Sequence, residues 1–255
     1  MRILGGDVLF LSFDTLRYDV AQAAFEAGEL PTLARVLPTS GWEERHSPGT
    51  FTYAAHAAFF AGFLPTPVAP GPHERLLAVA FEGSTSIGPS TTVLQGPDIV
   101  RGFEAEGYRT ICIGGTGFFN LRTPLGAELP GRFQEAHWSP ELGVTAIHST
   151  RAQVQLALER KAATSSPVFL FINLSAIHQP NCHYIPGRTM DDLETHRAAL
   201  RAVDAELGPL FDAFEGGTLL LMSDHGTLYG EEGYTGHRVA HPLVTTVPFA
   251  VRPRP

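Results

Sequence analysis

An apolar run that ends in an acid and an imidazole is the first candidate for chemistry in this sequence. Leu219 to Gly226 reads Leu-Leu-Leu-Met-Ser-Asp-His-Gly, and the run is too short for most helices. We predict a buried strand that delivers Asp224 and His225 to the carboxyl edge of a sheet, where open α/β sheets gather their ligands. Ser-Asp-His-Gly also forms an ordinary turn after a strand, so the motif alone leaves both interpretations open.

Residues that could bind a metal also follow two other predicted strands. Asp14 ends the first strand of the chain, and His178 follows a later one. A parallel sheet places such strand ends on one edge, so these side chains are expected to converge with Asp224 and His225. Two carboxylates with imidazoles suit Zn²⁺ or Mn²⁺ better than Ca²⁺, which prefers oxygen ligands alone. The alternative is a set of polar strand ends of the kind found in α/β proteins without a metal.

A threonine at the start of a predicted helix is a candidate nucleophile. Thr52 precedes the helix predicted at Tyr53–Phe60, where free N–H groups and the helix dipole favour negative charge. Beside a metal that lowers its pKa, this hydroxyl could attack phosphorus. Thr52 could instead only cap the helix, and Thr50 is an alternative cap or nucleophile. His56 lies one turn later on the same helix face, within reach of a bound anion.

Strands alternate with helices along the chain, which predicts a three-layer α/β sandwich with a mainly parallel central sheet covered by helices on both faces. Besides the strand before Asp224, we predict strands at Asp7–Phe13, Leu76–Phe81, Arg109–Ile113, Val168–Leu174 and Val247–Val251. Helices are predicted at Leu16–Gly28, Leu33–Leu37, Tyr53–Phe60, Asp98–Gly107, Thr145–Lys161 and Asp191–Phe214. The chain is expected to form a single domain, 1–255, in which residues 65–143 form a loop-rich lid or specificity region.

Charge and composition narrow the class of protein. The chain has 18 basic and 26 acidic residues, for a net charge of −8, and Lys161 is its only lysine. This excludes a basic footprint for nucleic acid, and anionic lipid would repel such a surface. No stretch approaches the roughly eighteen apolar residues that span a bilayer. Met1–Phe13 lacks the features of a signal peptide, so we expect a cytoplasmic protein whose two cysteines, Cys112 and Cys182, are free thiols.

Four blocks of the sequence occur in the order and spacing of the alkaline phosphatase superfamily. The blocks are Val8–Arg17, Ser47–Gly62, Ser223–Gly226 and Gly236-His237. They are most similar to the sulfatase-like and phosphoethanolamine-transferase-like branch of that superfamily, and the chain resembles a compact member. The resemblance covers about residues 8–62 and 167–252 and implies an alkaline-phosphatase-like fold.

The resemblance also implies a role for each matching residue. In the family, one metal is bound by the Asp after the first strand, the nucleophile and the Asp-His pair. The matching residues in this sequence are Asp14, Thr52, Asp224 and His225. The nucleophile stands five residues into the Ser-Pro block and four before the His, which selects Thr52 over Thr50. The late Gly-His motif implies that His237 is a ligand of a second metal or a cationic contact to the substrate.

Two departures from the family pattern affect the expected chemistry. Sulfatases use a Cys or Ser that is converted to an aldehyde hydrate, which Thr52 cannot become, so phosphoryl chemistry is favoured over sulfate ester hydrolysis. Members with two metals supply another Asp, and then a His, after the middle strand. The corresponding stretch, Ile172–Tyr184, contains no Asp, which leaves His178 as the remaining ligand for a second site. His183 contacts the substrate in one interpretation and is merely exposed in the other.

The expected function is therefore that of a metal-dependent hydrolase of phosphate mono- or diesters that forms a covalent phospho-enzyme on Thr52. The cofactor is expected to be Zn²⁺ or Mn²⁺, and the partner a small anionic ester rather than nucleic acid or a membrane. Arg17, just beyond Asp14, either binds the phosphate or pairs with Asp19. The alternatives are a phosphotransferase or mutase, a sulfatase-like esterase, and a non-catalytic relative that binds an anion.

Overall fold

The protein is described by a computed structural model that covers residues 5–62 and 98–255, together with two short strands, β3 (Leu77–Ala78) and β4 (Thr92–Val93), which pair with each other. The central sheet has seven strands, in the spatial order β2 (Glu43–His46), β11 (Thr246–Arg252), β8 (Thr218–Ser223), β1 (Val8–Phe13), β7 (Val168–Leu174), β5 (Arg109–Ile113) and β6 (Glu135–His137). The strands from β8 to β6 are mutually parallel, and β11 runs antiparallel to both of its neighbours.

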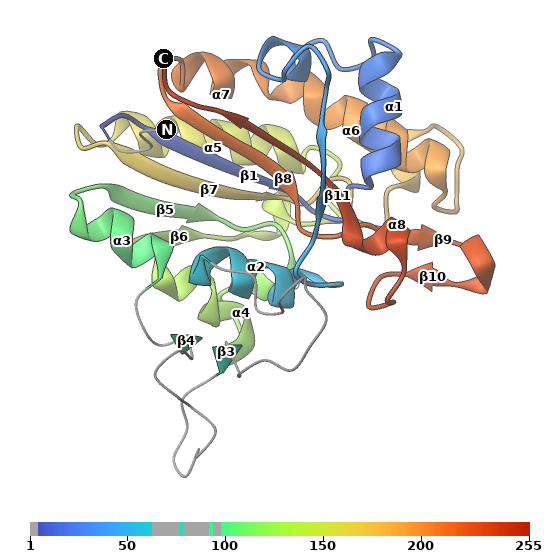
Figure 1. Cartoon of the computed structure of the whole chain (residues 1–255), viewed down its shortest axis with the longest axis horizontal. Coiled ribbons are helices and arrows are strands. Elements are labelled where there is room, and N and C mark those ends of the chain that lie inside the picture. Colours follow the sequence, from blue (N-terminus) through green and yellow to red (C-terminus); the bar gives the residue numbers. More distant parts are fainter. Residues whose placement is uncertain (1–4, 63–76, 79–91, 94–97) are drawn as a thin grey trace.

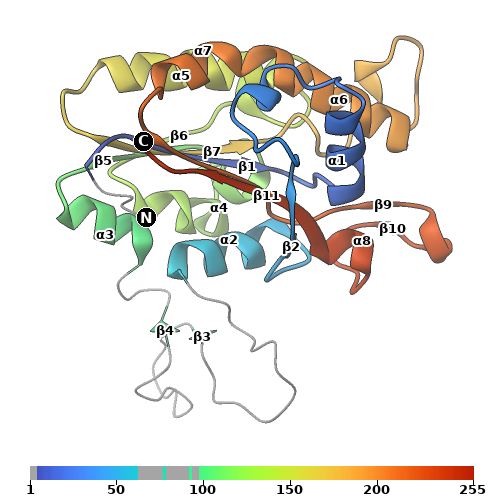
Figure 2. The ribbon, with the colours of Figure 1, turned by 45° about the horizontal axis from the view of Figure 1, so that its top comes forward.

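Helices cover both faces of this sheet (Figures 1 and 2). One face carries α1 (Tyr18–Glu26), α5 (Ser149–Ala162), α6 (Leu193–Glu206) and α7 (Gly208–Ala213), and the other carries α2 (Thr52–Ala61), α3 (Ile99–Ala105) and α4 (Pro124–Glu128). The predicted mainly parallel α/β sandwich is therefore confirmed. Among the described residues, no helix has the length and apolar character needed to cross a membrane.

The two faces of the sheet have different cores because side chains alternate along each strand. In β7, aliphatic residues such as Leu170 and Ile172 join the core beneath α1, α5 and α6, whereas Phe169 and Phe171 point to the opposite face. There Phe169 stacks on Phe103 with ring centroids 4.2 Å apart, and Phe171 packs tilted against Phe133 at 5.9 Å. The side of the sheet that carries α2 is thus an aromatic layer.

The connection between β8 and β11 contains a small hairpin and a short helix. After β8 the chain forms a hairpin of β9 (Leu228–Tyr229) and β10 (Thr235–Gly236), and then α8 (Pro242–Thr245), which leads into β11 (Figure 1). Single 3₁₀ turns complete the described elements: Leu33–Arg35, Gly117–Phe119, Pro130–Arg132, Pro140–Leu142, Cys182–Tyr184 and Glu231–Gly233.

The single long helix predicted over residues 191–214 is wrong, because the chain forms α6 and α7 instead. The break falls at Leu207, between the end of α6 at Glu206 and the start of α7 at Gly208. Pro209 is the second residue of α7; proline lacks the N–H that a continuous helix requires and fits only the first turn of a helix.

Two polar stretches form strands that the sequence pattern did not predict. All four side chains of β2 are exposed, so the segment has no apolar alternation to detect. The described part of the region predicted to be loop-rich, residues 65–143, contains α4 and the three-residue strand β6. Most of the strand predicted at 76–81, and much of the proposed lid at 65–143, lie outside the described residues.

The register of the central strands sets the positions of the site residues. Phe13 in β1 pairs with Ser223 in β8 and with Leu174 in β7. The residues that follow β1 and β8 are Asp14 and Asp224, so the sheet places these two carboxylates side by side.

Gly226→Ala should destabilise the end of β8. The Gly226 N–H donates to the Val244 carbonyl at 2.7 Å, and an added Cβ would lie 2.0 Å from the Leu243 carbonyl oxygen. Because that oxygen belongs to the backbone, we expect a loss of about 1–3 kcal/mol in the free energy of unfolding, measured by urea titration. Gly102→Ala in α3, where no atom lies within 4 Å of the added Cβ, should instead be neutral or stabilise by up to about 1 kcal/mol. Equal effects of the two substitutions would contradict this account.

Candidate active site

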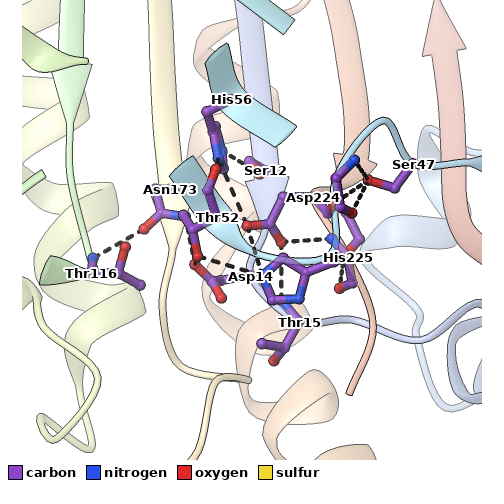
Figure 3. A network of polar contacts seen from close by, with 12 residues as sticks. Ser12, Asp14, Thr15, Ser47, Thr52, His56, Thr116, Asn173, Asp224 and His225 are labelled. Atoms are coloured by element: carbon purple, nitrogen blue, oxygen red, sulfur yellow. Dashed lines mark hydrogen bonds and ion pairs between the residues drawn. The ribbon is translucent and has the colours of Figure 1, made fainter. Parts of the chain in front are cut away.

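Two buried carboxylates, Asp14 and Asp224, form the centre of the site (Figure 3). Both side chains are fully buried. One oxygen of each, Asp14 Oδ1 and Asp224 Oδ2, has no hydrogen-bond partner in the part of the chain that the structure describes. Buried polar atoms are nearly always satisfied, so two unpartnered carboxylate oxygens in one place indicate a missing positive partner.

The other oxygen of each carboxylate is held by the surrounding backbone and side chains. Asp224 Oδ1 accepts from the backbone N–H groups of Thr15 at 3.1 Å and His225 at 2.9 Å. Asp14 Oδ2 accepts from the Asn173 amide at 3.0 Å. Thr15 has a φ of +63°, which is rare for a β-branched residue and occurs here where its N–H must reach Asp224.

Burial also changes the protonation of the pair. It raises the pKa of Asp224 to about 7, and burial together with the charge of Asp224 raises the pKa of Asp14 to about 6. One potential ligand atom from each of Asp14, Asp224 and His225 lies within 4.8 Å of the others. This donor set suits a divalent metal, whose charge would offset the cost of burying two carboxylates.

His225 is held in the form that binds metals. Its Nδ1 lies 2.9 Å from the Gly226 carbonyl, which can only accept, so Nδ1 carries the proton and Nε2 has a free lone pair. Nε2 lies 3.4 Å from Thr52 Oγ1 and 3.4 Å from Asp224 Oδ2. Burial lowers the pKa of His225, which favours the neutral imidazole that coordinates metals.

Thr52 begins α2 and directs its hydroxyl toward the carboxylates. Its side chain is 2% exposed, and Oγ1 lies 3.5 Å from Asp14 Oδ2. The preceding segment is fixed at two points: the Ser47 hydroxyl hydrogen-bonds the Asp224 main-chain oxygen, and the Arg238 N–H donates to the Thr50 carbonyl at 2.8 Å. The hydroxyl is therefore positioned by contacts to both the strand end and the loop after β10.

Three histidines meet beside this centre. The ring centroids of His225 and His237 are 4.7 Å apart, and those of His178 and His237 are 5.5 Å apart. Burial, and then the neighbouring His225 and His178, lower the pKa of His237 to about 3, and its buried Nδ1 has no partner among the described residues. His178 Nδ1 donates to the Gln179 carbonyl at 2.5 Å. The low pKa of His237 fits the predicted ligand role rather than the cationic one.

A cavity of about 330 Å³ adjoins these residues. Its lining contains Thr52, His178, His237 and Arg238, together with Thr116, Gly117, Phe118, Thr123, Leu125, Gly126 and Val144. Arg238 is exposed and, among the described residues of this lining, is the only one with a permanent charge. The cavity can therefore bring an anionic group to Thr52.

His56 does not have the environment that the sequence predicted. Its Nδ1 donates to the Thr52 carbonyl at 2.7 Å, and its Nε2 lies 2.9 Å from Ser12 Oγ. Phe119 and Phe171 enclose the ring edge-on, and burial lowers its pKa to about 3. Both ring nitrogens are used within the protein, so His56 is not free to contact a bound anion and instead holds the first turn of α2.

Arg17 is also not available to a substrate. Its side chain is 3% exposed and pairs with Asp19 at 2.6 Å and with Glu231. Of the two roles considered from the sequence, ion pairing with Asp19 is therefore the observed one, and the second partner, Glu231, holds the β9–β10 hairpin against the domain.

His183 lies in a different cavity from Thr52. It packs against Tyr184, with ring centroids 4.4 Å apart, and lines a pocket together with His148 and Arg151. The prediction of a substrate contact is not supported, because none of these residues lines the cavity over Thr52.

A second buried polar network anchors the hairpin that carries His237. The hydroxyl of Tyr229 in β9 lies 2.9 Å from His196 Nδ1 and accepts from the Asn181 amide at 3.0 Å. The backbone N–H of Arg17 donates to His196 Nε2 at 3.4 Å, so Nδ1 carries the ring proton. Burial lowers the pKa of His196 to about 3.

Sequence reasoning missed two residues at the site. Asn173 interrupts the otherwise apolar β7, and its Oδ1 accepts from the Thr116 N–H at 3.0 Å while its amide holds Asp14. That interruption was a usable signal for a buried polar role. Arg238 directly follows the Gly-His motif, but only the structure places it in the cavity with Thr52.

No protein-family model matches the sequence, and neither does any curated protein sequence. Solved structures do match. The C-terminal periplasmic domain of EcEptC from Escherichia coli, in complex with Zn, is 12% identical with a TM-score of 0.66, over 98% of this chain and 73% of that one. The corresponding domain of the phosphoethanolamine transferase EptC from Campylobacter jejuni is 13% identical with a TM-score of 0.63, over 97% and 79%.

A protein of the alkaline phosphatase superfamily from Vibrio parahaemolyticus is 15% identical with a TM-score of 0.59, over 98% of this chain and 60% of that one. The chain thus has an alkaline-phosphatase-superfamily fold of the phosphoethanolamine-transferase type. The expectation of a cytoplasmic protein is contradicted, because the matched EptC structures are periplasmic domains.

Asp224→Asn should abolish tight metal binding. We expect the wild-type chain to bind one Zn²⁺ tightly, and the substitution, which removes one ligand charge, to weaken binding by at least about 100-fold. Equilibrium dialysis with elemental analysis measures this without any assay of activity. Asp212→Asn, at an exposed carboxylate that pairs with Arg35, is the matched control and should bind as the wild type does. If Asp224→Asn still bound Zn²⁺ tightly, the Asp224 carboxylate would not be a metal ligand.

His196→Gln should reduce the loss of stability in acid. The pKa of His196 is about 3 in the folded state and about 6.5 in the unfolded chain, so the unfolded state takes up the proton first. The stability that neutral His196 contributes is complete above about pH 6.5 and is lost as the pH falls toward 3. Acidification from pH 7 to 4.5 should therefore lower the free energy of unfolding by on the order of 2–3 kcal/mol through His196.

Urea unfolding in EDTA at the two pH values measures that difference. The loss on acidification should shrink in His196→Gln, whereas His46→Gln, on the exposed strand β2, should leave it unchanged. An unchanged pH dependence in His196→Gln would show that this histidine does not govern the acid response.

Proposed function

We propose that this chain cleaves phosphate esters in a metal-dependent reaction in which Thr52 is the nucleophile and carries the phosphoryl group as a covalent intermediate. The observation that carries the proposal is the position of Thr52 Oγ1, 3.5 Å from Asp14 Oδ2 and 3.4 Å from His225 Nε2. The same residue lines a cavity that contains Arg238 and two further imidazoles.

Asp14, Asp224 and His225 would hold the divalent metal, with Thr52 beside it. When bound, such a metal supplies positive charge that lowers the pKa of a neighbouring hydroxyl and attracts phosphoryl oxygens. The unpartnered oxygens of Asp14 and Asp224 and the free Nε2 of His225 are the donors that fit it.

The chain's own residues account for the remaining parts of the reaction. Thr52 Oγ1 attacks phosphorus and forms a new P–O bond as the bond to the leaving alcohol breaks. Asp14 Oδ2 is placed to accept the hydroxyl proton, and the leaving oxygen takes a proton from water. Arg238 offers positive charge to the non-bridging oxygens. Attack by a second oxygen nucleophile on the phosphothreonine then restores the Thr52 hydroxyl.

Transfer to an alcohol, rather than to water, is a second candidate. The fold likeness to a phosphoethanolamine transferase favours it, since the same phosphothreonine can be resolved by either acceptor. Hydrolysis and transfer differ only in this last step, so the products identify which one the chain performs.

Thr52→Ala should abolish turnover and Thr52→Ser should preserve part of it. With Zn²⁺-loaded protein and bis-p-nitrophenyl phosphate, we expect kcat to fall at least about 10³-fold in the alanine variant, because the nucleophilic oxygen is lost. The serine variant keeps that oxygen and serves as the matched control. Mass spectrometry of acid-quenched protein should find the phosphoryl adduct on the peptide that contains residue 52 in the wild type and serine variant only.

Equal turnover by wild type and Thr52→Ala would exclude the proposed nucleophile. Binding of Zn²⁺ and phosphate without turnover of any ester would instead identify a non-catalytic anion-binding protein. Glycerol added as acceptor separates the two catalytic candidates, since transfer yields a glycerol phosphodiester and hydrolysis yields the free p-nitrophenyl phosphate.

A further inference from the structure

The cavity beside Thr52 is lined by side chains of two chemical kinds. Thr52, the two imidazoles and Arg238 suit a phosphoryl group. Phe118, Leu125 and Val144 line the same cavity and are apolar. A phosphate ester bound with phosphorus at Thr52 would therefore have apolar side chains within the same cavity to receive its alcohol portion.

One of these apolar residues, Phe118, packs against the neighbours of the nucleophile. The Phe118 ring is 6.3 Å from that of Phe51 and 5.7 Å from that of Tyr53, the two residues that flank Thr52 in the chain. Leu125, in α4, is 52% exposed although it lines the cavity. Leucine exposed at the mouth of a polar site is an apolar contact offered to a ligand.

Hydrogen bonds and close packing hold the segments that carry these apolar side chains, which form the apolar wall of the cavity. The Thr116 N–H is held by Asn173 Oδ1 at 3.0 Å, and the Thr123 hydroxyl caps α4 by accepting from the Gly126 N–H at 3.0 Å. An added Cβ on Gly126 would lie 2.2 Å from Asn120 Oδ1. Such contacts preorganise this part of the lining for a ligand.

The described lining contains no carboxylate that could receive a cationic head group. Of the residues that line the cavity, none is Asp or Glu. The acid on α4, Glu128, already pairs with Arg132 at 3.2 Å. Arg238 adds a positive charge to the same cavity, which would repel a substituted ammonium group.

We infer that the site selects phosphate esters whose alcohol portion is uncharged and apolar, and that Leu125 and Phe118 set this preference. The inference rests on the proposed phosphoester chemistry at Thr52. It distinguishes this chain from an enzyme that recognises an ammonium head group such as ethanolamine or choline.

A matched pair of substrates tests the preference directly. The mixed phosphodiesters of p-nitrophenol with choline and with 3,3-dimethylbutanol have the same shape and leaving group. They differ only in that a carbon atom in the second replaces the quaternary nitrogen of the first. We expect Zn²⁺-loaded wild-type protein to favour the dimethylbutyl ester by about tenfold in kcat/KM, because its apolar wall cannot compensate the desolvation of a cation. Equal use of the two esters, or preference for choline, would overturn the inference.

Leu125→Glu should move the preference toward choline, and Leu125→Gln is its neutral, isosteric control. A carboxylate at this partly exposed position should change the ratio of the two kcat/KM values by about tenfold relative to the glutamine variant. Both variants should release p-nitrophenol from Thr52-dependent turnover. Identical ratios in the glutamate and glutamine variants would show that Leu125 does not contact the alcohol portion.

A binding comparison separates failure of this inference from failure of the proposed function. If neither diester is cleaved, the proposed chemistry fails, and calorimetry with Zn²⁺-loaded protein compares phosphocholine with 3,3-dimethylbutyl phosphate. Tighter binding of the dimethylbutyl ester, reversed toward phosphocholine in Leu125→Glu, would support the selectivity on its own. Equal binding of the two, or binding of neither, would overturn it.

Discussion

The architecture of this site depends on one electrostatic constraint, which is that two carboxylates are buried side by side. The register of β1 against β8 fixes it, because Asp14 and Asp224 each follow the last residue of a paired strand. Like charges in a dry environment resist ionisation, and the raised pKa values of both groups express that resistance. A bound cation would offset the repulsion between the two ionised carboxylates. The free energy stored in this unfavourable pair is therefore available to binding rather than to folding.

Much of the surrounding polar structure exists to hold this pair in place. Asn173 connects Asp14 to the loop that forms the cavity wall, and Thr15 adopts a left-handed conformation to reach Asp224. A more distant set of contacts, centred on Tyr229 and the Arg17–Glu231 ion pair, fixes the hairpin that presents His237. Buried ion pairs contribute little net stability, so their value here is in positioning.

The sequence contained enough information for the fold and for the centre of the site, but less for its periphery. Strand ends in a parallel sheet share an edge whatever the details of packing, so the convergence of Asp14, Asp224 and His225 follows from pattern alone. The sequence predicted that His56 reaches a bound anion, because helical spacing places it on the same helix face as Thr52. Helical spacing does not show how that face is oriented relative to the sheet. Arg17 was ambiguous because its partner, Glu231, is 214 residues away. Strand β2 has no buried face, and hence no periodicity to read.

Charge balance would tie a second cation at this site to the anionic substrate. The two carboxylates of the described cluster would neutralise a single divalent cation held together with His225. Asn173 in β7 adds no charge, because its side chain is an amide whose oxygen already accepts from the Thr116 N–H. A second divalent cation beside His178 and His237 would leave an excess of positive charge next to Arg238, and a phosphoryl group is the ligand that would compensate it. Under the proposed chemistry, a second cation would therefore bind together with the substrate, whereas the first would not require it.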